Sequence, residues 1–179
     1  MAKSYLNQNG LPRGIRNNNP GNIVISNNSW QGKIAVAQNT DGHFEQFTEL
    51  YYGLRALAKL LVNKVNDGQN TIRKILVSYA PSFENDTSGY INYVSTKSGI
   101  NPDEPLNMNS NTLAALMRAI CEQENGKQMA DTYITDEDIY NSIGLLPEAI
   151  LQQIAYTARK NSDFVAFFLC CWQCLQWFS

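Results

Sequence analysis

Histidine is almost absent from this sequence: His43 is the only one in the chain. Zinc and similar metals need several closely spaced His or Cys ligands, and the close pair Cys171 and Cys174 has no second pair to complete a site. We therefore expect no metal and no cofactor. A cysteine peptidase acting through Cys121 is also disfavoured, because its base would have to be His43 and Cys121 lies in mid-helix. The cysteines are expected to be reduced, buried thiols.

Charged residues are also scarce, at 17% of the chain, and the formal net charge is −2. Proteins that bind nucleic acids neutralise phosphates with clustered Lys and Arg. No run of basic residues occurs in this sequence. We therefore expect no nucleic-acid partner.

The sequence lacks a long apolar run of the kind that crosses a membrane or directs secretion. Residues 1–10 are polar, so we expect no signal peptide and synthesis in the cytoplasm. Near the other end, the apolar segment 164–178 is interrupted by Gln173 and Gln176. It is shorter than the roughly 20 residues that span a bilayer. Three interpretations remain: it packs on the preceding helix, binds a partner chain, or inserts at a membrane interface. We favour the first two.

Apolar residues recur mainly at helical spacing, which predicts a mainly α fold (α+β with few short strands) in a single domain. The turn signal Thr40-Asp41-Gly42 predicts a short hairpin within residues 36–47. We expect an N-terminal arm (1–13), one folded domain (14–160) and an apolar C-terminal tail (161–179). The expected helices run from Leu50 to the Asp67-Gly68 pair and over residues 71–79, 88–98, 112–126, 136–143 and 146–159.

The helix predicted over residues 112–126 carries a glutamate on its apolar face. Leu113, Met117, Ile120 and Glu124 are spaced four, three and four residues apart, which places them in one stripe. A carboxyl group on a buried face either finds a partner or keeps its proton. General-acid catalysis requires such a protonated carboxyl group. The alternative is a structural Glu that reaches solvent or a buried arginine, such as Arg16 or Arg55.

Glu122 is off this stripe and lies one turn after Arg118. We expect it on the solvated face, in an (i, i+4) ion pair with that arginine.

Residues 119–126 read Ala-Ile-Cys-Glu-Gln-Glu-Asn-Gly. This segment resembles the catalytic helix end of lysozyme-superfamily lytic transglycosylases, where an Ala-Ile-rich helix ends in Glu-Ser-Gly. Asn125 stands where that family usually has Ser. Residues 14–23, Gly-Ile-Arg-Asn-Asn-Asn-Pro-Gly-Asn-Ile, are similar to the Asn-Asn-x-x-Gly-Ile loop of flagellar-type glucosaminidases and to the start of a group of phage-associated proteins that end in Glu-Asn-Gly.

Further motifs of the same families follow along the chain. The glucosaminidase loop precedes Trp, Gly, an acidic turn and an aromatic pair, and the late transglycosylase segment contains Ala-Tyr-Asn and Glu-Thr-Arg-x-Tyr-Val. The corresponding residues here are Trp30, Gly32, Asp41-Gly42, Phe44, Phe47 and Tyr52-Gly53, then 78–81, 84–87 and 90–94. The Arg after Glu-Thr is absent. In the families the glutamate helix comes first, whereas here it comes last. The resemblance, over 14–126, therefore implies a circularly permuted lysozyme-like fold. Permutation requires that residues 17–23 and Glu124 meet in one groove.

The resemblance implies cleavage of peptidoglycan glycan strands, with Glu124 as general acid and then base. A transglycosylase needs no second carboxylate, whereas an ordinary hydrolase does, and the candidates for it are Asp41, Glu84 and Asp86. Asp41 is alternatively a turn residue, and Glu84 a helix cap, although Asp86, Thr87 and Ser88 suit capping better. The candidate sugar-binding residues are Asn18, Asn19, Asn22, Tyr79, Tyr90 and Asn125; their alternative roles are in turns and in the core.

Three functions fit the sequence. The first is an enzyme that is made in the cytoplasm and acts on the periplasmic cell wall, as in phage lysis or infection. The second is a non-catalytic virion structural or cell-wall-binding protein, which would gain nothing from a carboxyl group on an apolar stripe. The third is a secreted antibacterial effector that uses the same chemistry. The expected partner is peptidoglycan.

Removal of the apolar tail tests its predicted packing. Deletion of the residues after Lys160 is expected to lower solubility or stability, because an apolar surface loses its cover, while leaving Glu124-dependent activity detectable. Thermal melting and sedimentation with lipid vesicles measure the two effects. A truncated protein that is more soluble, equally stable and no longer sediments with vesicles would show that the tail is a membrane anchor.

Overall fold

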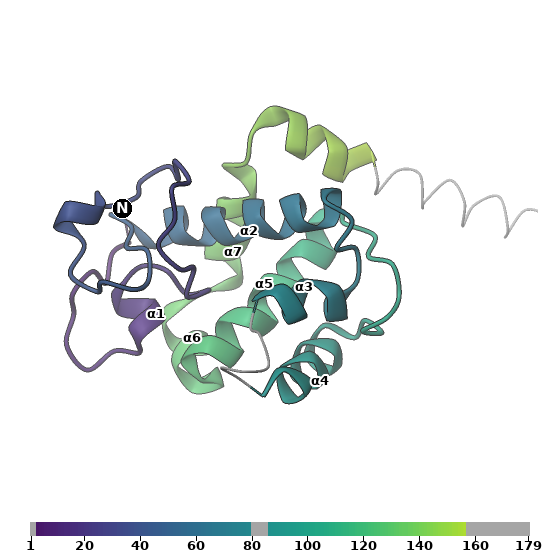
Figure 1. The fold of residues 1–179 in the computed structure, drawn as a ribbon, viewed down its shortest axis with the longest axis horizontal. Coiled ribbons are helices and arrows are strands. Elements are labelled where there is room, and N and C mark those ends of the chain that lie inside the picture. The colour runs from purple at the N-terminus through teal and green to yellow at the C-terminus, as the bar shows by residue number, and fades with distance from the viewer. Residues whose placement is uncertain (1–2, 80–85, 157–179) are drawn as a thin grey trace, which may run out of the picture.

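Helix α5 (Ser110–Asn125) is the central element of the computed structural model, which describes residues 3–79 and 86–156. Five other helices contact it: α1 (Arg13–Arg16), α2 (Leu50–Asn66), α4 (Thr87–Ser98), α6 (Lys127–Tyr133) and α7 (Asp136–Gly144). Its stripe of Leu113, Met117 and Ile120 is at most 1% exposed. The fold is therefore built around this helix (Figure 1).

The remaining helices complete a mainly helical, single-domain fold. Helix α3 (Ile72–Tyr79) packs against α2 and α4, and α2 packs along α7. Residues 148–156 are helical up to the end of the described chain. All six predicted helices are thus present over the described residues, with ends shifted by one or two residues. Two short helices were missed, α1 and α6, because only Gly14 and Ile15 in one and Ala130 in the other are buried, too few to produce a periodic apolar stripe.

Local capping explains where several helices begin. The Asn109 side chain accepts hydrogen bonds from Asn111 N and Thr112 N at the start of α5, each 3.0 Å long. Asp86 caps α4 by accepting from Gly89 N at 2.9 Å, as its position before Thr87 suggested. Thr135 and Asp138 form a reciprocal capping box at the start of α7. These caps satisfy amide groups that no helical turn can satisfy.

The predicted hairpin at residues 36–47 is wrong. Residues Val36–Gln38 form a 3-10 helix, η1, and the only pairings among the described residues are isolated bridges of Val24 with Phe44 and of Lys33 with Phe47. The Asn39 side chain accepts from the amides of Asp41 and Gly42, which makes a local turn. Side-chain amides thus satisfy backbone groups that a second strand would otherwise bond.

Buried asparagines organise the loop-rich N-terminal part, which gathers at one end of the molecule (Figure 1). Asn18 accepts from Tyr5 N and donates to the carbonyl oxygen of Phe47, at 2.8 and 2.9 Å. Asn19 donates to the carbonyl oxygens of Ile23 and Glu45, both at 2.9 Å. Both side chains are fully buried. They hold the segment 17–23, hereafter the Asn loop, in a single conformation, in which Asn18 has a φ of 52°.

The predicted N-terminal arm is attached to the domain from residue 3 onward. Leu50 N donates to the carbonyl oxygen of Lys3 at 2.8 Å, and the Lys3 ammonium pairs with Asp138 of α7 at 2.5 Å. The tail, 161–179, lies outside the described residues. Within 3–79 and 86–156, no helix combines the length and the apolar character that crossing a membrane requires.

Gly53 allows the Asn loop to lie directly on α2. A methyl group at Gly53 would overlap the carbonyl oxygen of Asn18, which is backbone and cannot move aside alone. Gly53→Ala is therefore expected to lower the free energy of unfolding by about 1–3 kcal/mol, although Ala normally stabilises a helix interior over Gly. Chemical denaturation measures the change. Gly144→Ala is the control, because a methyl group there meets no atom within 4 Å, so it should be neutral or slightly stabilising. Equal effects of the two substitutions would contradict this account.

Candidate active site

Glu124 lies at the last turn of α5, in a cleft between this helix and α4. The cleft has a volume of about 360 Å³ and is lined by Asp86, Gly89, Tyr90, Tyr93, Gln123 and Glu124. The helix ends one residue later, at Asn125, and Gly126 follows with a φ of 79°. The helix end thus presents a half-buried carboxyl group to an open cavity.

Both carboxyl oxygens of Glu124 accept a hydrogen bond from another element. The Tyr90 hydroxyl, from α4, donates to Oε1 at 2.7 Å. The Asn22 side-chain amide, from the Asn loop, donates to Oε2 at 2.8 Å. Neither Arg16 nor Arg55, the alternative partners, bonds to it; Arg55 donates to the carbonyl oxygen of Leu145. Neutral donors therefore orient the carboxyl group without supplying a full positive charge.

The balance between burial and these donors sets the protonation of Glu124. Burial raises its pKa, whereas the hydrogen bonds from Tyr90 and Asn22 lower it, and the net effect is a pKa above the usual value for Glu. Burial favours the neutral acid, and the donors favour the carboxylate. Glu124 consequently keeps its proton to a higher pH than an exposed glutamate does, and its two donors are in place to stabilise the anion once the proton leaves.

The Asn loop meets the end of α5 directly, which confirms the predicted contact between residues 17–23 and Glu124. Besides the bond from Asn22, Asn125 donates to the carbonyl oxygen of Pro20 at 2.8 Å. The Tyr79 hydroxyl donates to the carbonyl oxygen of Gly21. Gly14 lies against Asn125 and Asn22 so closely that a side chain would not fit. The N-terminal part of the chain therefore packs against the end of α5 that carries Glu124.

The predicted sugar-binding residues separate into three groups in the structure. Asn22 and Tyr90 contact Glu124 itself, whereas Tyr79 and Asn125 hold the Asn loop. Asn18 and Asn19 are fully buried and bonded to backbone groups. This geometry gives those two residues a structural role and leaves their side chains without access to a substrate.

Asp41 lies apart from the cleft of Glu124. Its carboxylate pairs with Arg13 at 2.7 Å and accepts from the Asn17 amide at 2.8 Å, and it lines a different, polar hollow. Burial alone would raise the pKa of Asp41, but the hydrogen bonds from Arg13, Asn17 and Phe44 N outweigh it and lower the pKa well below the usual value. Asp41 is thus a fixed anion in a turn, the alternative role that the sequence suggested.

Glu84, another candidate carboxylate, lies outside the described residues. Among the described lining residues of the cleft, Asp86 is the acidic side chain besides Glu124. One of its oxygens accepts from Gly89 N as the cap of α4.

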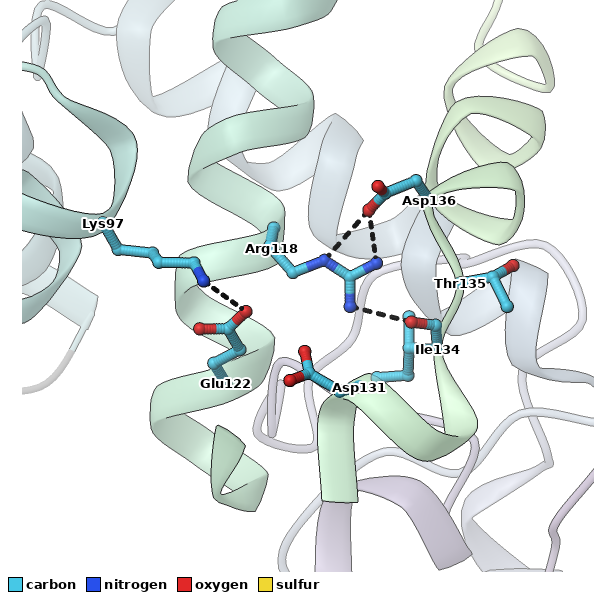
Figure 2. Close-up of a pocket in the computed structure, with 7 residues that line it drawn as sticks. All are labelled: Lys97, Arg118, Glu122, Asp131, Ile134, Thr135 and Asp136. Atoms are coloured by element: carbon cyan, nitrogen blue, oxygen red, sulfur yellow. Dashed lines mark hydrogen bonds and ion pairs between the residues drawn. The ribbon is translucent and has the colours of Figure 1, made fainter. Parts of the chain in front are cut away.

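The predicted position of Glu122 on a solvated face is wrong. Its side chain is only 1% exposed, and it pairs with Lys97 of α4 at 3.0 Å. Arg118 instead bonds to Asp136 and to the carbonyl oxygen of Ile134, at 2.6 and 2.7 Å (Figure 2). The prediction failed because helices surround α5, so that residues off its apolar stripe also face neighbours.

Two side chains of the cleft were missed by sequence reasoning, Tyr93 and Gln123. Tyr93 lies three residues after Tyr90 and therefore on the same side of α4. That spacing was the signal that could have identified it.

The thiol of Cys121 is fully buried, and burial raises its pKa to about 12. It is therefore an inert core group, as expected, and not a nucleophile. No cluster of three or more His, Cys, Asp or Glu side chains suited to a metal ion occurs in the described part of the chain.

The fold and the site define a mainly helical, single-domain protein with a half-buried glutamate of raised pKa at the end of its central helix. The sequence is similar to Protein P5 of Pseudoalteromonas phage PM2, with 37% identity over 141 residues. The alignment covers 76% of this chain and 82% of the phage protein. The chain therefore belongs to the same family as this phage protein. No family model matches the sequence.

Removal of the Tyr90 hydroxyl tests the account of the protonation of Glu124. Because the bond from Tyr90 lowers the pKa of Glu124, Tyr90→Phe is expected to raise this pKa further. The carboxyl carbon of Glu124, followed by NMR as a function of pH, reports the change. Tyr5→Phe is the matched control, because that hydroxyl bonds to the carbonyl oxygen of Tyr133. An unchanged or lower pKa in Tyr90→Phe would show that this bond does not govern the protonation.

Proposed function

We propose that this protein cleaves the glycan strands of bacterial peptidoglycan, with Glu124 as general acid and then general base. The observation that carries the proposal is the half-buried carboxyl group with a raised pKa, held in a cleft by Tyr90 and Asn22. Cleavage of a glycosidic bond needs a carboxylic acid that is still protonated near neutral pH.

In this mechanism, Glu124 transfers its proton to the oxygen of the glycosidic bond as the bond to the sugar ring breaks. The resulting carboxylate then accepts the bonds from the Tyr90 hydroxyl and the Asn22 amide, which stabilise the negative charge. The same carboxylate next takes a proton from the group that attacks the sugar. In this way one residue serves both steps, since its environment tolerates both protonation states.

The identity of the attacking group separates a lytic transglycosylase from a hydrolase. In a transglycosylase the 6-hydroxyl of the muramoyl sugar attacks its own ring and leaves a 1,6-anhydro end, so no second carboxylate is needed. The isolation of Asp41 from the cleft and the capping role of Asp86 support this route among the described residues. Hydrolysis by water is the alternative, and it calls for a second carboxylate near Glu124.

Membership in the family of a phage protein supports a phage context, in which a protein made in the host cytoplasm opens the periplasmic wall during lysis or infection. The lysozyme-like fold with permuted order is part of the proposal. It is supported by the contact between the Asn loop, which begins the resemblance, and the glutamate helix, which ends it.

Glu124→Gln is the decisive variant, because it removes the proton donor and preserves the volume of the side chain. We expect cleavage of purified sacculi to fall by at least about a hundredfold. Mass spectrometry of released muropeptides measures this loss. The control is Glu104→Gln, which neutralises an exposed carboxylate outside the cleft and should leave activity unchanged. Circular dichroism and thermal melting verify that both variants fold.

The products of the wild-type protein identify the reaction. Anhydro ends indicate a transglycosylase, and reducing ends indicate a hydrolase. Activity of Glu124→Gln within tenfold of wild type would overturn the role of Glu124. Wild-type protein that sediments with sacculi and releases no muropeptides would instead indicate a non-catalytic wall-binding protein.

A further inference from the structure

Tyr93 lines the Glu124 cleft, and a hydrogen bond from its hydroxyl to Glu122 holds the side chain in place. Its ring is half-buried, and its hydroxyl donates to Oε2 of Glu122 at 2.8 Å. Burial, together with the bond and the charge of Glu122, raises the pKa of Tyr93 to about 12. The phenol is therefore a neutral donor throughout the physiological pH range.

Glu122, which accepts this bond, is buried and forms an ion pair. The side chain of Glu122 is 1% exposed, and the Lys97 ammonium lies 3.0 Å from its Oε1 (Figure 2). A buried carboxylate needs such a partner, because its desolvation is otherwise costly. Lys97 follows Tyr93 by four residues on α4, so both side chains reach Glu122 from the same helix face. Together these three residues form a brace between α4 and α5, two residues before Glu124.

The brace restricts the motion of the Tyr93 side chain. A half-exposed tyrosine without a bonded hydroxyl samples several rotamers, and binding a ligand to it costs the entropy of selecting one of them. In Tyr93 the hydroxyl end is fixed to Glu122, so the ring keeps its place in the cleft wall before any ligand binds. Such preorganisation favours binding.

Gln123, from α5, lines the same cleft as Tyr93. Its side chain is exposed, and its amide makes no hydrogen bond with any described residue. A free amide offers two donors and one acceptor oxygen. An aromatic ring and an exposed amide in one cleft match an N-acetylated sugar, since the C–H face of a pyranose packs on an aromatic ring and the acetamido group bonds to an amide.

We propose that Tyr93 and Gln123 form a binding subsite for an N-acetylated pyranose ring adjacent to Glu124, with Glu122 and Lys97 as its positioning residues. The identification of the sugar rests on the proposed function. The subsite assigns distinct roles to two neighbouring carboxyl groups of α5: Glu124 acts on the bond, whereas Glu122 acts through Tyr93 on the sugar.

Binding is measured with the full chain carrying Glu124→Gln, so that cleavage cannot consume the ligand. Isothermal titration with N-acetylglucosamine oligomers gives the affinity. Adding Tyr93→Leu is expected to weaken binding about five- to tenfold, the range of an aromatic contact. Tyr93→Phe keeps the ring and loses the brace, so a smaller loss, about two- to threefold, is expected. Gln123→Ala should weaken binding by about threefold or more. Tyr156→Leu is the matched control, because Tyr156 is 66% exposed and lies outside the cleft.

Kinetics with otherwise wild-type protein separate a binding role from a structural one. Tyr93→Leu should raise the KM for soluble glycan strands and leave kcat within about threefold, because uniform binding is lost and the acid is retained. A merely structural brace would lower the melting temperature without changing KM. The conservative Tyr93→Phe should restore most of the KM, since it restores the ring.

Failure of this subsite is distinguishable from failure of the proposed function. If Tyr93→Phe, Tyr93→Leu and Gln123→Ala all fold and bind the oligomers as the parent does, the subsite is overturned, whatever the wild-type protein cleaves. If oligomer binding depends on Tyr93 and Gln123 while the wild-type protein releases no muropeptides, the subsite stands as a binding site and the proposed catalysis fails. Melting temperatures establish which variants are folded, and Gln123→Ala, on an exposed side chain, keeps the test valid if Tyr93→Leu does not fold.

Discussion

The contact between the Asn loop and the C-terminal end of α5 is the constraint on which the rest of the structure depends. Asn22 bonds to Glu124, and Asn125 bonds to the backbone of Pro20, so each partner orients the other. Gly53 on α2 and Gly14 on α1 have no side chains because the loop backbone and the two asparagine amides occupy that space. The position of Glu124 in the cleft and the packing of α1 and α2 therefore depend on the close contact between the Asn loop and its neighbours.

Polar side chains, and not a sheet, provide the order of the N-terminal part. Buried amides are costly unless they are bonded, and here Asn18, Asn19 and Gln46 bond to backbone or side-chain groups that strands would otherwise satisfy. Each amide supplies both donors and an acceptor, so a few residues replace a ladder of main-chain pairs. These positions therefore tolerate few substitutions, since an apolar or shorter side chain would leave several backbone groups unpaired.

Helical periodicity predicted the helical part of the fold well, and the reason is local. A helix buries one face, and the positions of Leu113, Met117 and Ile120 show that face within a single segment. The same reasoning placed Glu124 on the apolar face of the helix. The resemblance of residues 14–23 identified Asn22, which bonds to Glu124, as a candidate site residue. Periodicity failed for Glu122, because a central helix has neighbours on nearly every side and its polar residues pair across helices. The turn signal Thr40-Asp41-Gly42 predicted a hairpin that does not form, because the turn residues bond to nearby side chains and amides and not to a second strand. The contacts of Lys97 and Tyr93 with Glu122 depend on how α4 packs against α5, and a local sequence pattern does not reveal this packing.

The sequence separation of Asn22 and Glu124, 102 residues, has a consequence for the order of events during synthesis. The ribosome synthesises the Asn loop first. Its contact with α5 can form only after that helix has been translated. Closing so long a loop costs chain entropy. The contacts between the Asn loop and α5 must offset this cost when they form. The hydrogen bond that orients Glu124 from the Asn loop therefore forms only after α5, which follows α1 to α4 in the chain, has been synthesised.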